Sequence, residues 1–277
     1  MSPPLQTYYI QWYNMDMSEV YAMKLEKLII SFVSVTLILS GCAKTEVTNI
    51  SDADLMLQLE SEHFEFYSVA ADKKCLDDLS TEIESNYKRL TSDLKINLDY
   101  KPKVYIYPNL EAFHKSINQL NAPDWAVGTA WGKDLKMVSP LNPGKSHSYE
   151  TIKQVLVHEF VHVLEINIVD NPQSLLTWLW EGIACFEANQ MNDSAKKVLR
   201  EEALNNNAPT LEELSKNFYT VQNAYQYSYS IVDFMVNTYG KDKLVEILND
   251  YKNIEKILGI SMDAFEKQWI QYIKESY

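Results

Sequence analysis

The first part of the chain carries short segments in which apolar and polar residues alternate. Residues 63–67 alternate with two phenylalanines on one face, and residues 104–107 form a second short apolar segment. Such alternation is typical of strands that bury one face. Residues 125–140 hold two apolar runs on either side of a glycine-containing turn, which predicts a hairpin. We therefore expect a mixed or antiparallel sheet within residues 61–148.

The rest of the chain has the apolar spacing of helices. Its longest predicted helix covers residues 149–168. Further helices are expected at residues 76–94, 110–120, 174–190, 194–204, 211–216, 223–239, 241–251 and 262–275. Strands come first and helices second, so the fold class is α+β, with a sheet-rich subdomain at 61–148 and a helical subdomain at 149–277.

The N-terminal region carries a different pattern. Residues 28–39 are an uninterrupted run of apolar and small residues, preceded by Lys24 and Lys27. A run of about a dozen residues is too short to span a bilayer and fits the centre of a secretory signal. It ends in Leu-Ser-Gly-Cys42, which resembles the lipobox of bacterial lipoproteins. The alternative is a free cysteine after a signal anchor.

These features predict how the N-terminal region is processed. The signal begins at about residue 23, and residues 1–22 are an upstream extension, so residues 1–41 are excluded from the fold. Cys42 would carry the lipid and residues 42–60 would form a tether. We expect an exported protein that is anchored to the bacterial membrane, with its domain outside the cytoplasm.

The composition of the chain limits the kinds of molecule that it can bind. The formal net charge of -13 disfavours nucleic acid as a partner. Nothing in the sequence indicates assembly, so we expect a monomer. Cys75 and Cys185 would remain after Cys42 is lipidated. A disulfide between them is possible, but two buried free thiols are the preferred interpretation because Cys185 lies among apolar residues of a predicted helix.

The centre of the long predicted helix reads His-Glu-Phe-Val-His. Four residues turn a helix by about 400°, so His158 and His162 share a face and can take two corners of a tetrahedral Zn²⁺. Glu159 is rotated by about 100°, where it can take the proton of a zinc-bound water. Apolar neighbours embed these groups, and burying them is costly unless a metal or hydrogen bonds satisfy them. Core histidines satisfied by hydrogen bonds are the alternative.

A third ligand for one zinc ion must come from another element. Glu181 lies in Trp-Leu-Trp-Glu-Gly-Ile-Ala, inside an apolar stretch of the next predicted helix. Glu165 is a rival, but it lies on the same helix as the histidines and should point past the metal. It would be either solvated or in support of a ligand. Glu187 would be either exposed or in support of a ligand.

Together these motifs resemble a known family. The HExxH motif, an interval of eighteen residues and Glu181 within W-L-x-E-G-x-A are similar to gluzincin aminopeptidases and, more closely, to bacterial peptidase MA-like domains. The resemblance covers about residues 60–277. It implies a zincin-like fold, hydrolysis of peptide or protein substrates, and Glu181 as the third zinc ligand.

The resemblance extends to residues 225–240, where the family has a tyrosine that donates a hydrogen bond to the tetrahedral oxyanion. The matching residue is Tyr225, and Tyr229, one helical turn further, is the second candidate. A tyrosine that only packs is the alternative.

One family feature is missing. The aminopeptidases carry a Gly-x-Met-Glu-Asn segment that holds the free amine of the substrate, and nothing here matches it. The corresponding stretch, residues 126–132, is interpreted as an edge strand that pairs with an extended peptide through Gly128, Thr129 and Ala130. Cleavage of internal bonds is therefore at least as well supported as removal of terminal residues. His147, in a serine-containing loop, is expected to be exposed.

Two other functions stay open on the sequence alone. A catalytically silent, surface peptide- or wall-binding lipoprotein could share this fold. The second alternative is an enzyme that hydrolyses an amide bond outside a peptide. The intact Glu159 favours a hydrolase, because a binding protein has no need of a general base.

Overall fold

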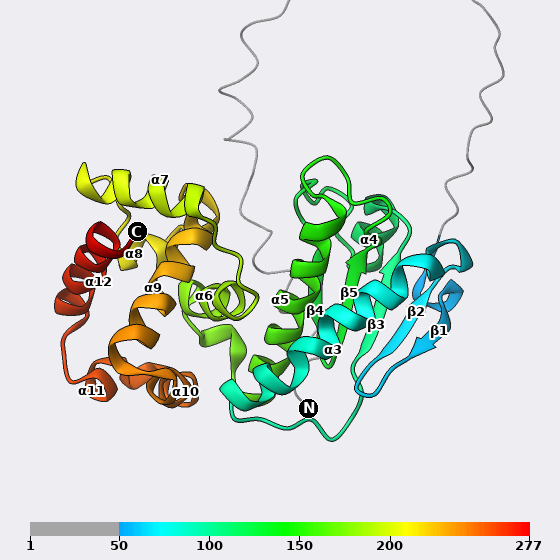
Figure 1. Cartoon of the computed structure of the whole chain (residues 1–277), viewed down its shortest axis with the longest axis horizontal. Helices are drawn as coiled ribbons and strands as arrows, with labels where there is room; N and C mark the ends of the chain where they lie inside the picture. Colours follow the sequence, from blue (N-terminus) through cyan, green and yellow to red (C-terminus); the bar gives the residue numbers. More distant parts are fainter. Residues whose placement is uncertain (1–49) are drawn as a thin grey trace, which may run out of the picture. The chain divides into compact units, whose positions relative to one another are not determined.

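The computed structural model describes residues 50–277, which are coloured from blue to red in Figure 1. The predicted signal and residues 42–49 of the predicted tether, Cys42 among them, lie outside the described residues. Among residues 50–277, no helix is long and apolar enough to span a membrane.

A five-stranded mixed sheet forms the first half of the described chain, as predicted. Its strands are β1 (Met56–Glu60), β2 (Glu65–Ser68), β3 (Lys103–Tyr107), β4 (Gly128–Trp131) and β5 (Asp134–Val138). Their spatial order is β1-β2-β3-β5-β4. The inner pairs β2–β3 and β3–β5 are parallel, and the outer pairs β1–β2 and β4–β5 are antiparallel. The predicted hairpin therefore places β4 at one edge of the sheet.

Strand β1 corrects the tether prediction. Residues 56–60 belong to the predicted tether, but they form the opposite edge strand, in which Met56 pairs with Ser68 of β2. The side chains of Met56 and Leu57 are exposed. An edge strand of this kind is held by backbone hydrogen bonds and buries little side-chain area, so it lacks the alternating pattern by which strands are recognised.

Two helices cover one face of the sheet, α3 (Leu76–Asp93) and α5 (Tyr149–Ile168) (Figure 1). The strand register aligns buried apolar residues on that face: Phe66, Val104, Leu135 and Ala130. Phe160 of α5 packs edge-on against Phe64, with ring centroids 4.9 Å apart. On the opposite face, Lys136 of β5 donates to the carbonyl of Ser116 at the end of α4 (Leu110–Ser116).

Helix α5 forms over the predicted residues. Its N-cap is Ser148, whose side chain accepts a hydrogen bond from the backbone N–H of Thr151. Every residue from Leu156 to Glu165 is buried, because α5 contacts the sheet on one side and α6 (Thr177–Glu187) on the other. The His-Glu-Phe-Val-His motif thus lies in the most buried part of the helix.

The second half of the described chain is helical. After α6 come α7 (Asp193–Leu204), α8 (Leu211–Lys216), α9 (Ala224–Tyr239), α10 (Lys241–Asn249), α11 (Ile254–Leu258) and α12 (Met262–Ser276). The predicted helix at 174–190 begins later than expected, because Pro172–Ser174 form a 3₁₀ turn. The short α11 was not predicted. The α+β fold class is confirmed.

Close packing between α6 and α9 fixes the position of α6. A Cβ atom on Gly182 would lie 2.6 Å from the backbone oxygen of Ser228 and 2.9 Å from a methyl carbon of Val232. Only glycine therefore allows this approach. Cys75 and Cys185 are buried and free, as the preferred interpretation predicted.

Candidate metal centre

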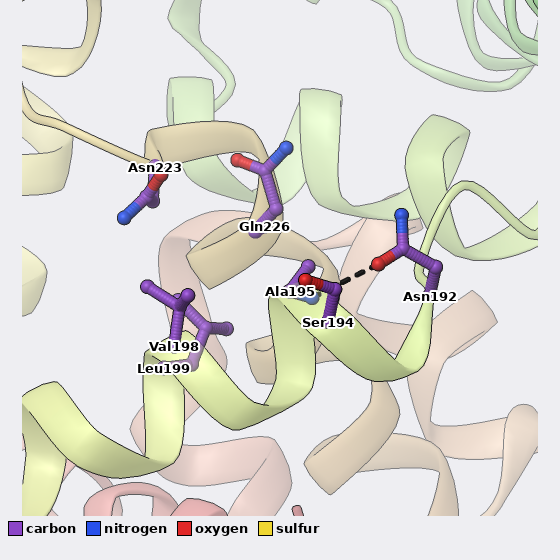
Figure 2. A pocket seen from close by; sticks show the side chains of 7 residues that line it. All are labelled: Asn192, Ser194, Ala195, Val198, Leu199, Asn223 and Gln226. Atoms are coloured by element: carbon purple, nitrogen blue, oxygen red, sulfur yellow. Dashed lines mark hydrogen bonds between the residues drawn. The ribbon is translucent and has the colours of Figure 1, made fainter.

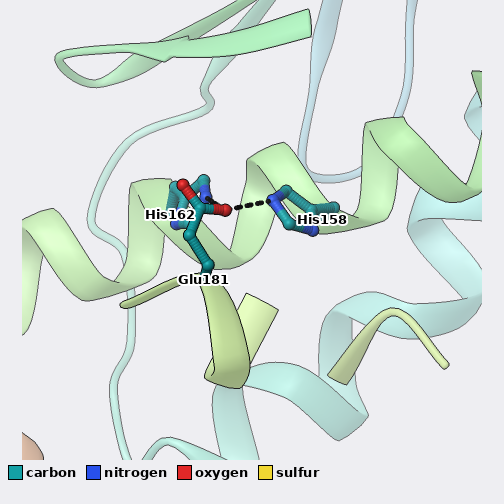
Figure 3. Close-up of side chains that lie close together, drawn as sticks. All are labelled: His158, His162 and Glu181. Carbon is teal, nitrogen blue, oxygen red and sulfur yellow. Dashed lines mark ion pairs between the residues drawn. The ribbon is translucent and has the colours of Figure 1, made fainter. Parts of the chain in front are cut away.

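Three side chains from two helices meet in the interior of the protein. His158 and His162 project from α5, and Glu181 reaches them from α6 (Figure 3). Glu181 Oε2 lies 3.3 Å from His158 Nε2 and 3.6 Å from His162 Nε2. All three side chains are buried, and one ligand atom from each lies within 4.8 Å of the other two. The structure thus brings together the three predicted metal ligands.

The other nitrogen of each imidazole is held by an oxygen. His158 Nδ1 lies 2.9 Å from Oε1 of Gln190, and His162 Nδ1 lies 2.7 Å from Oε2 of Glu165. Amide and carboxylate oxygens accept hydrogen bonds, so each Nδ1 carries the proton. Each Nε2 then faces Oε2 of Glu181 and can offer its lone pair to a metal ion once its own proton has left. This is the tautomer in which a histidine binds a metal through Nε2.

The His162 ring is held from a second side. The Trp180 ring stacks on it, with centroids 4.5 Å apart and an interplanar angle of 6°. Glu165, whose carboxylate supports the same ring, is fully buried. Of the two roles open for Glu165, support of a ligand is confirmed and the solvated position is wrong. Glu165 lies three residues after His162, so one helical turn brings its carboxylate back to that ring.

The electrostatics of the site favour positive charge at its centre. Burial alone would raise the pKa of Glu181, but hydrogen bonds from His158 and His162 lower it to about 2. Burial alone would lower the pKa of each histidine. Contact with Glu181, and for His162 also with Glu165, instead raises both pKa values to about 9. The carboxylates therefore need cationic partners in this buried place.

A divalent cation fits this arrangement. Among the described residues, every ion pair of Glu165 and Glu181 goes to an imidazole and none to lysine or arginine. Two nitrogens and one carboxylate oxygen converge, with the imidazole protons fixed on the outer nitrogens. Zn²⁺ prefers this donor set, and three protein ligands are typical of sites that keep one position open.

Glu159 lies between α5 and the edge strand β4. Its carboxylate accepts a hydrogen bond from the backbone N–H of Ala130. A Cβ atom on Gly128 would lie 3.0 Å from Cγ of Glu159 and 2.7 Å from a methyl carbon of Val155, so glycine permits this close contact. Burial raises the pKa of Glu159, although the two histidines act against it. The structure therefore places the predicted base beside the predicted substrate strand.

The two candidate tyrosines lie on α9 in different surroundings. Tyr225 is half-buried, and its ring packs edge-on against Phe218 at 5.0 Å. Burial, together with the charge of Glu181, raises the pKa of Tyr225 well above its ordinary value. Tyr229 packs against Phe186, and after burial the largest influence on its pKa is Asp233. Tyr225 is therefore the tyrosine that experiences the charge of the metal centre.

Three residues have positions or contacts that the sequence did not predict. Glu187 is neither exposed nor in contact with a ligand, since its carboxylate is buried and paired with Arg89 of α3. His147 is only half-exposed, and its Nε2 lies 3.1 Å from the carbonyl of Trp125. Gln190 was not predicted. It follows Glu181 by nine residues, and no spacing rule for metal sites indicates such a position.

A separate cavity of about 270 Å³ lies between the first turns of α7 and α9 (Figure 2). It is lined by Asn192, Ser194, Ala195, Val198, Leu199, Asn223 and Gln226. The side chain of Asn192 is engaged in capping α7, where it accepts from the N–H of Ala195 at 2.9 Å. None of the three metal-centre side chains lines this cavity.

Comparison with known proteins agrees with the site. A comparison with curated proteins found no significant match. The sequence model of the peptidase MA superfamily matches residues 84–275, which contain all of α5, α6 and α9. The match spans well over half of the 277 residues and includes both histidines and Glu181. The chain belongs to the peptidase MA superfamily, and its buried His158, His162 and Glu181 form the metal-binding triad of such an enzyme.

Proposed function

We propose that the protein is a metallopeptidase that holds one zinc ion on His158, His162 and Glu181 and hydrolyses peptide bonds. One observation carries the proposal. Both imidazoles point Nε2 at the same carboxylate oxygen, while an oxygen acceptor fixes each Nδ1. Histidines that served packing alone would not need this common orientation. Membership of the peptidase MA superfamily supports the reaction class.

Glu159 is the proposed general base. When bound, zinc would supply Lewis-acid activation of the attacking water and of the scissile carbonyl. Glu159 then accepts a proton from that water and returns it to the leaving nitrogen. Burial favours this role because it raises the carboxyl pKa and so increases its basicity. The N–H of Ala130 holds the carboxylate in place during both transfers.

Tyr225 is the proposed oxyanion donor. A phenol is protonated at neutral pH, and the raised pKa of Tyr225 keeps it so, so the hydroxyl is available to donate a hydrogen bond to the developing negative charge. The influence of Glu181 and Glu159 on this pKa supports a position that faces the metal centre. Tyr229 remains the second candidate and has weaker support, because neither of these acids is among the groups that shift its pKa.

Strand β4 is the proposed substrate strand. The carbonyl of Val127 accepts from the N–H of Val138 on β5, so alternate residues along β4 direct their backbone groups away from the sheet. Gly128 and Ala130 are those residues, and because the N–H of Ala130 already bonds to Glu159, Ala130 would offer a substrate its carbonyl. An extended peptide could pair with this free edge next to Glu159. Without a recognisable anchor for a free amine, internal peptide bonds are the proposed targets.

The proposal includes an extracytoplasmic location. The lipobox-like segment ending at Cys42 supports a lipid-anchored protein whose domain faces away from the cytoplasm. Metabolic labelling with a radioactive fatty acid tests this, since Cys42→Ala should lose the label. A label that persists in this variant would contradict lipidation at Cys42.

The decisive test of the mechanism is Glu159→Gln. The amide keeps the shape of the side chain but cannot take a proton, so zinc content should stay at one ion per chain while cleavage falls by about 10²–10⁴-fold. Zinc is measured by mass spectrometry and cleavage on a mixed peptide library. Retained cleavage would exclude Glu159 as the base. If the unaltered, zinc-loaded protein cleaves no peptide, a silent binding protein or an amidase of another kind becomes the better proposal.

A further inference from the structure

The support of His158 comes from the turn that follows α6. The backbone N–H of Gln190 donates to the carbonyl of Cys185 at 3.0 Å, and Asn189 adopts a left-handed conformation with φ of 52°. This turn ends the helix and places Oε1 of Gln190 2.9 Å from His158 Nδ1. Helix α6 therefore contributes twice to the site, through Glu181 within the helix and Gln190 just beyond its end.

The last turn of α6 is anchored to the sheet-rich subdomain. Arg89 of α3 donates from Nη1 to the carboxylate of Glu187 at 2.5 Å and from Nη2 to the backbone carbonyl of Glu187 at 2.7 Å. One planar guanidinium thus holds both the side chain and the backbone of the same residue. Such a two-point contact restricts the rotation of the turn as well as its position.

The acid of this anchor is buried although Arg89 is exposed, and a third helix is involved. Glu187 is 2% exposed. Its second carboxylate oxygen lies 3.6 Å from Nζ of Lys241, the first residue of α10, and Lys241 also pairs with Asp93 of α3. Three helices therefore converge on the residue that lies three positions before Gln190. A displacement of this turn would move the amide that orients His158.

We propose that Gln190 is a positioning residue for the metal centre and that the pair of Arg89 and Glu187 holds it in place. The inference rests on the proposed zinc site. Gln190 accepts the Nδ1 proton of His158 and so keeps the Nε2 lone pair directed at the metal. The contact between Arg89 and Glu187 then sets the affinity for zinc from a distance, without touching the ion or the substrate.

The test measures the zinc dissociation constant of the purified full-length chain by competition with a chromogenic chelator. Gln190→Leu removes the acceptor and should weaken zinc binding by about 10–100-fold. Gln190→Glu keeps an acceptor and should bind zinc as tightly as the unaltered protein. Thermal unfolding of the metal-free forms is measured beside it: Gln190→Glu should unfold like the unaltered protein, and Gln190→Leu should unfold at a lower temperature, because the buried Nδ1–H of His158 loses its acceptor.

The anchor is tested in the same assay. Arg89→Ala should weaken zinc binding by about tenfold. The zinc affinity of Arg89→Lys should lie between those of Arg89→Ala and the unaltered protein, because an ammonium cannot make both contacts in the same geometry. Asp242→Asn is the matched control, since it breaks the exposed pair between Lys95 and Asp242, which also joins the end of α3 to α10. This control should leave zinc affinity unchanged.

The outcomes separate the inference from the proposed function. Failure of the unaltered protein to bind zinc would overturn the metal centre itself. Tight binding by the unaltered protein together with equal affinity in Gln190→Leu would overturn the positioning role. An Arg89→Ala variant that loses thermal stability yet keeps its zinc affinity would show that the anchor is only structural.

Discussion

Two buried acids of helix α6 have very different partners. Glu187, at the end of the helix, is paired with Arg89 and lies near Lys241. Glu181 lies six residues earlier, and among residues 50–277 its ion pairs go only to the imidazoles of His158 and His162. Arginine and lysine place a permanent positive charge beside the first acid. Glu181 instead faces imidazoles, which can bind either a proton or a metal ion. The kind of cationic partner therefore distinguishes an acid that stabilises the fold from an acid that binds a metal.

The largest expected effect comes from removing a ligand. His162→Ala leaves two protein donors, so zinc binding and peptide cleavage should both be lost. Arg89→Ala, which alters the other acid's partner, should keep cleavage at saturating zinc. Zinc content and cleavage rate are measured side by side, with His147→Ala as the histidine control outside the triad. A His162→Ala protein that still holds one zinc ion would contradict the assignment of the site.

Removing the metal should cost stability. If free zinc is about 1,000-fold above its dissociation constant, binding stabilises the folded state by about 4 kcal/mol, and a chelator removes that contribution. Denaturant unfolding with and without chelator measures the difference. Glu181→Ala serves as the control, since its unfolding should not respond to the chelator. An equal response in both proteins would mean that zinc stabilises the fold from another place.

A smaller effect concerns the pH dependence contributed by Glu187. Burial raises its pKa above the ordinary 4.5, and Lys241 and Arg89 only partly offset this, while Asp93 adds to it. A raised pKa means that the folded state holds the proton more tightly than the unfolded chain. The stability from this group is therefore present below pH 4.5 and is lost as the pH rises above that value.

Glu187→Gln isolates this contribution, because the amide does not titrate. The free energy of unfolding of the variant, relative to that of the unaltered protein, should increase as the pH rises through 4.5 and above. Urea unfolding across this range in the presence of a chelator measures it. The opposite slope would mean that Arg89 and Lys241 lower the pKa of Glu187 by more than burial raises it. Glu187 would then be held as a carboxylate by its ion pairs, and its difference from Glu181 would be larger than proposed.

The sequence predicted the elements that local spacing controls. Helical geometry paired His158 with His162, and an apolar setting together with the family's eighteen-residue interval identified Glu181. The long helix and the hairpin followed from periodicity in the same way. Each of these features depends on residues close together in the chain or on a motif of fixed length.

The contacts that the sequence did not predict join distant residues. Arg89 and Glu187 are 98 positions apart, and Gln190 reaches His158 only because the turn after α6 has a left-handed residue. Strand β1 was missed because an exposed edge strand has no apolar face to reveal it. The ion pair, the Gln190 contact and the edge strand all depend on tertiary packing, which local sequence patterns do not predict.

Gly128 has a consequence for how the enzyme can diversify. Its missing side chain leaves room for Glu159 and Val155 in the same place. Any larger residue would displace both the strand proposed to hold the substrate and the acid proposed to move the proton. Substrate preference and turnover therefore cannot vary independently at this position. We therefore expect substitutions that change substrate preference to fall in the loops that flank β4, while Gly128 stays unchanged.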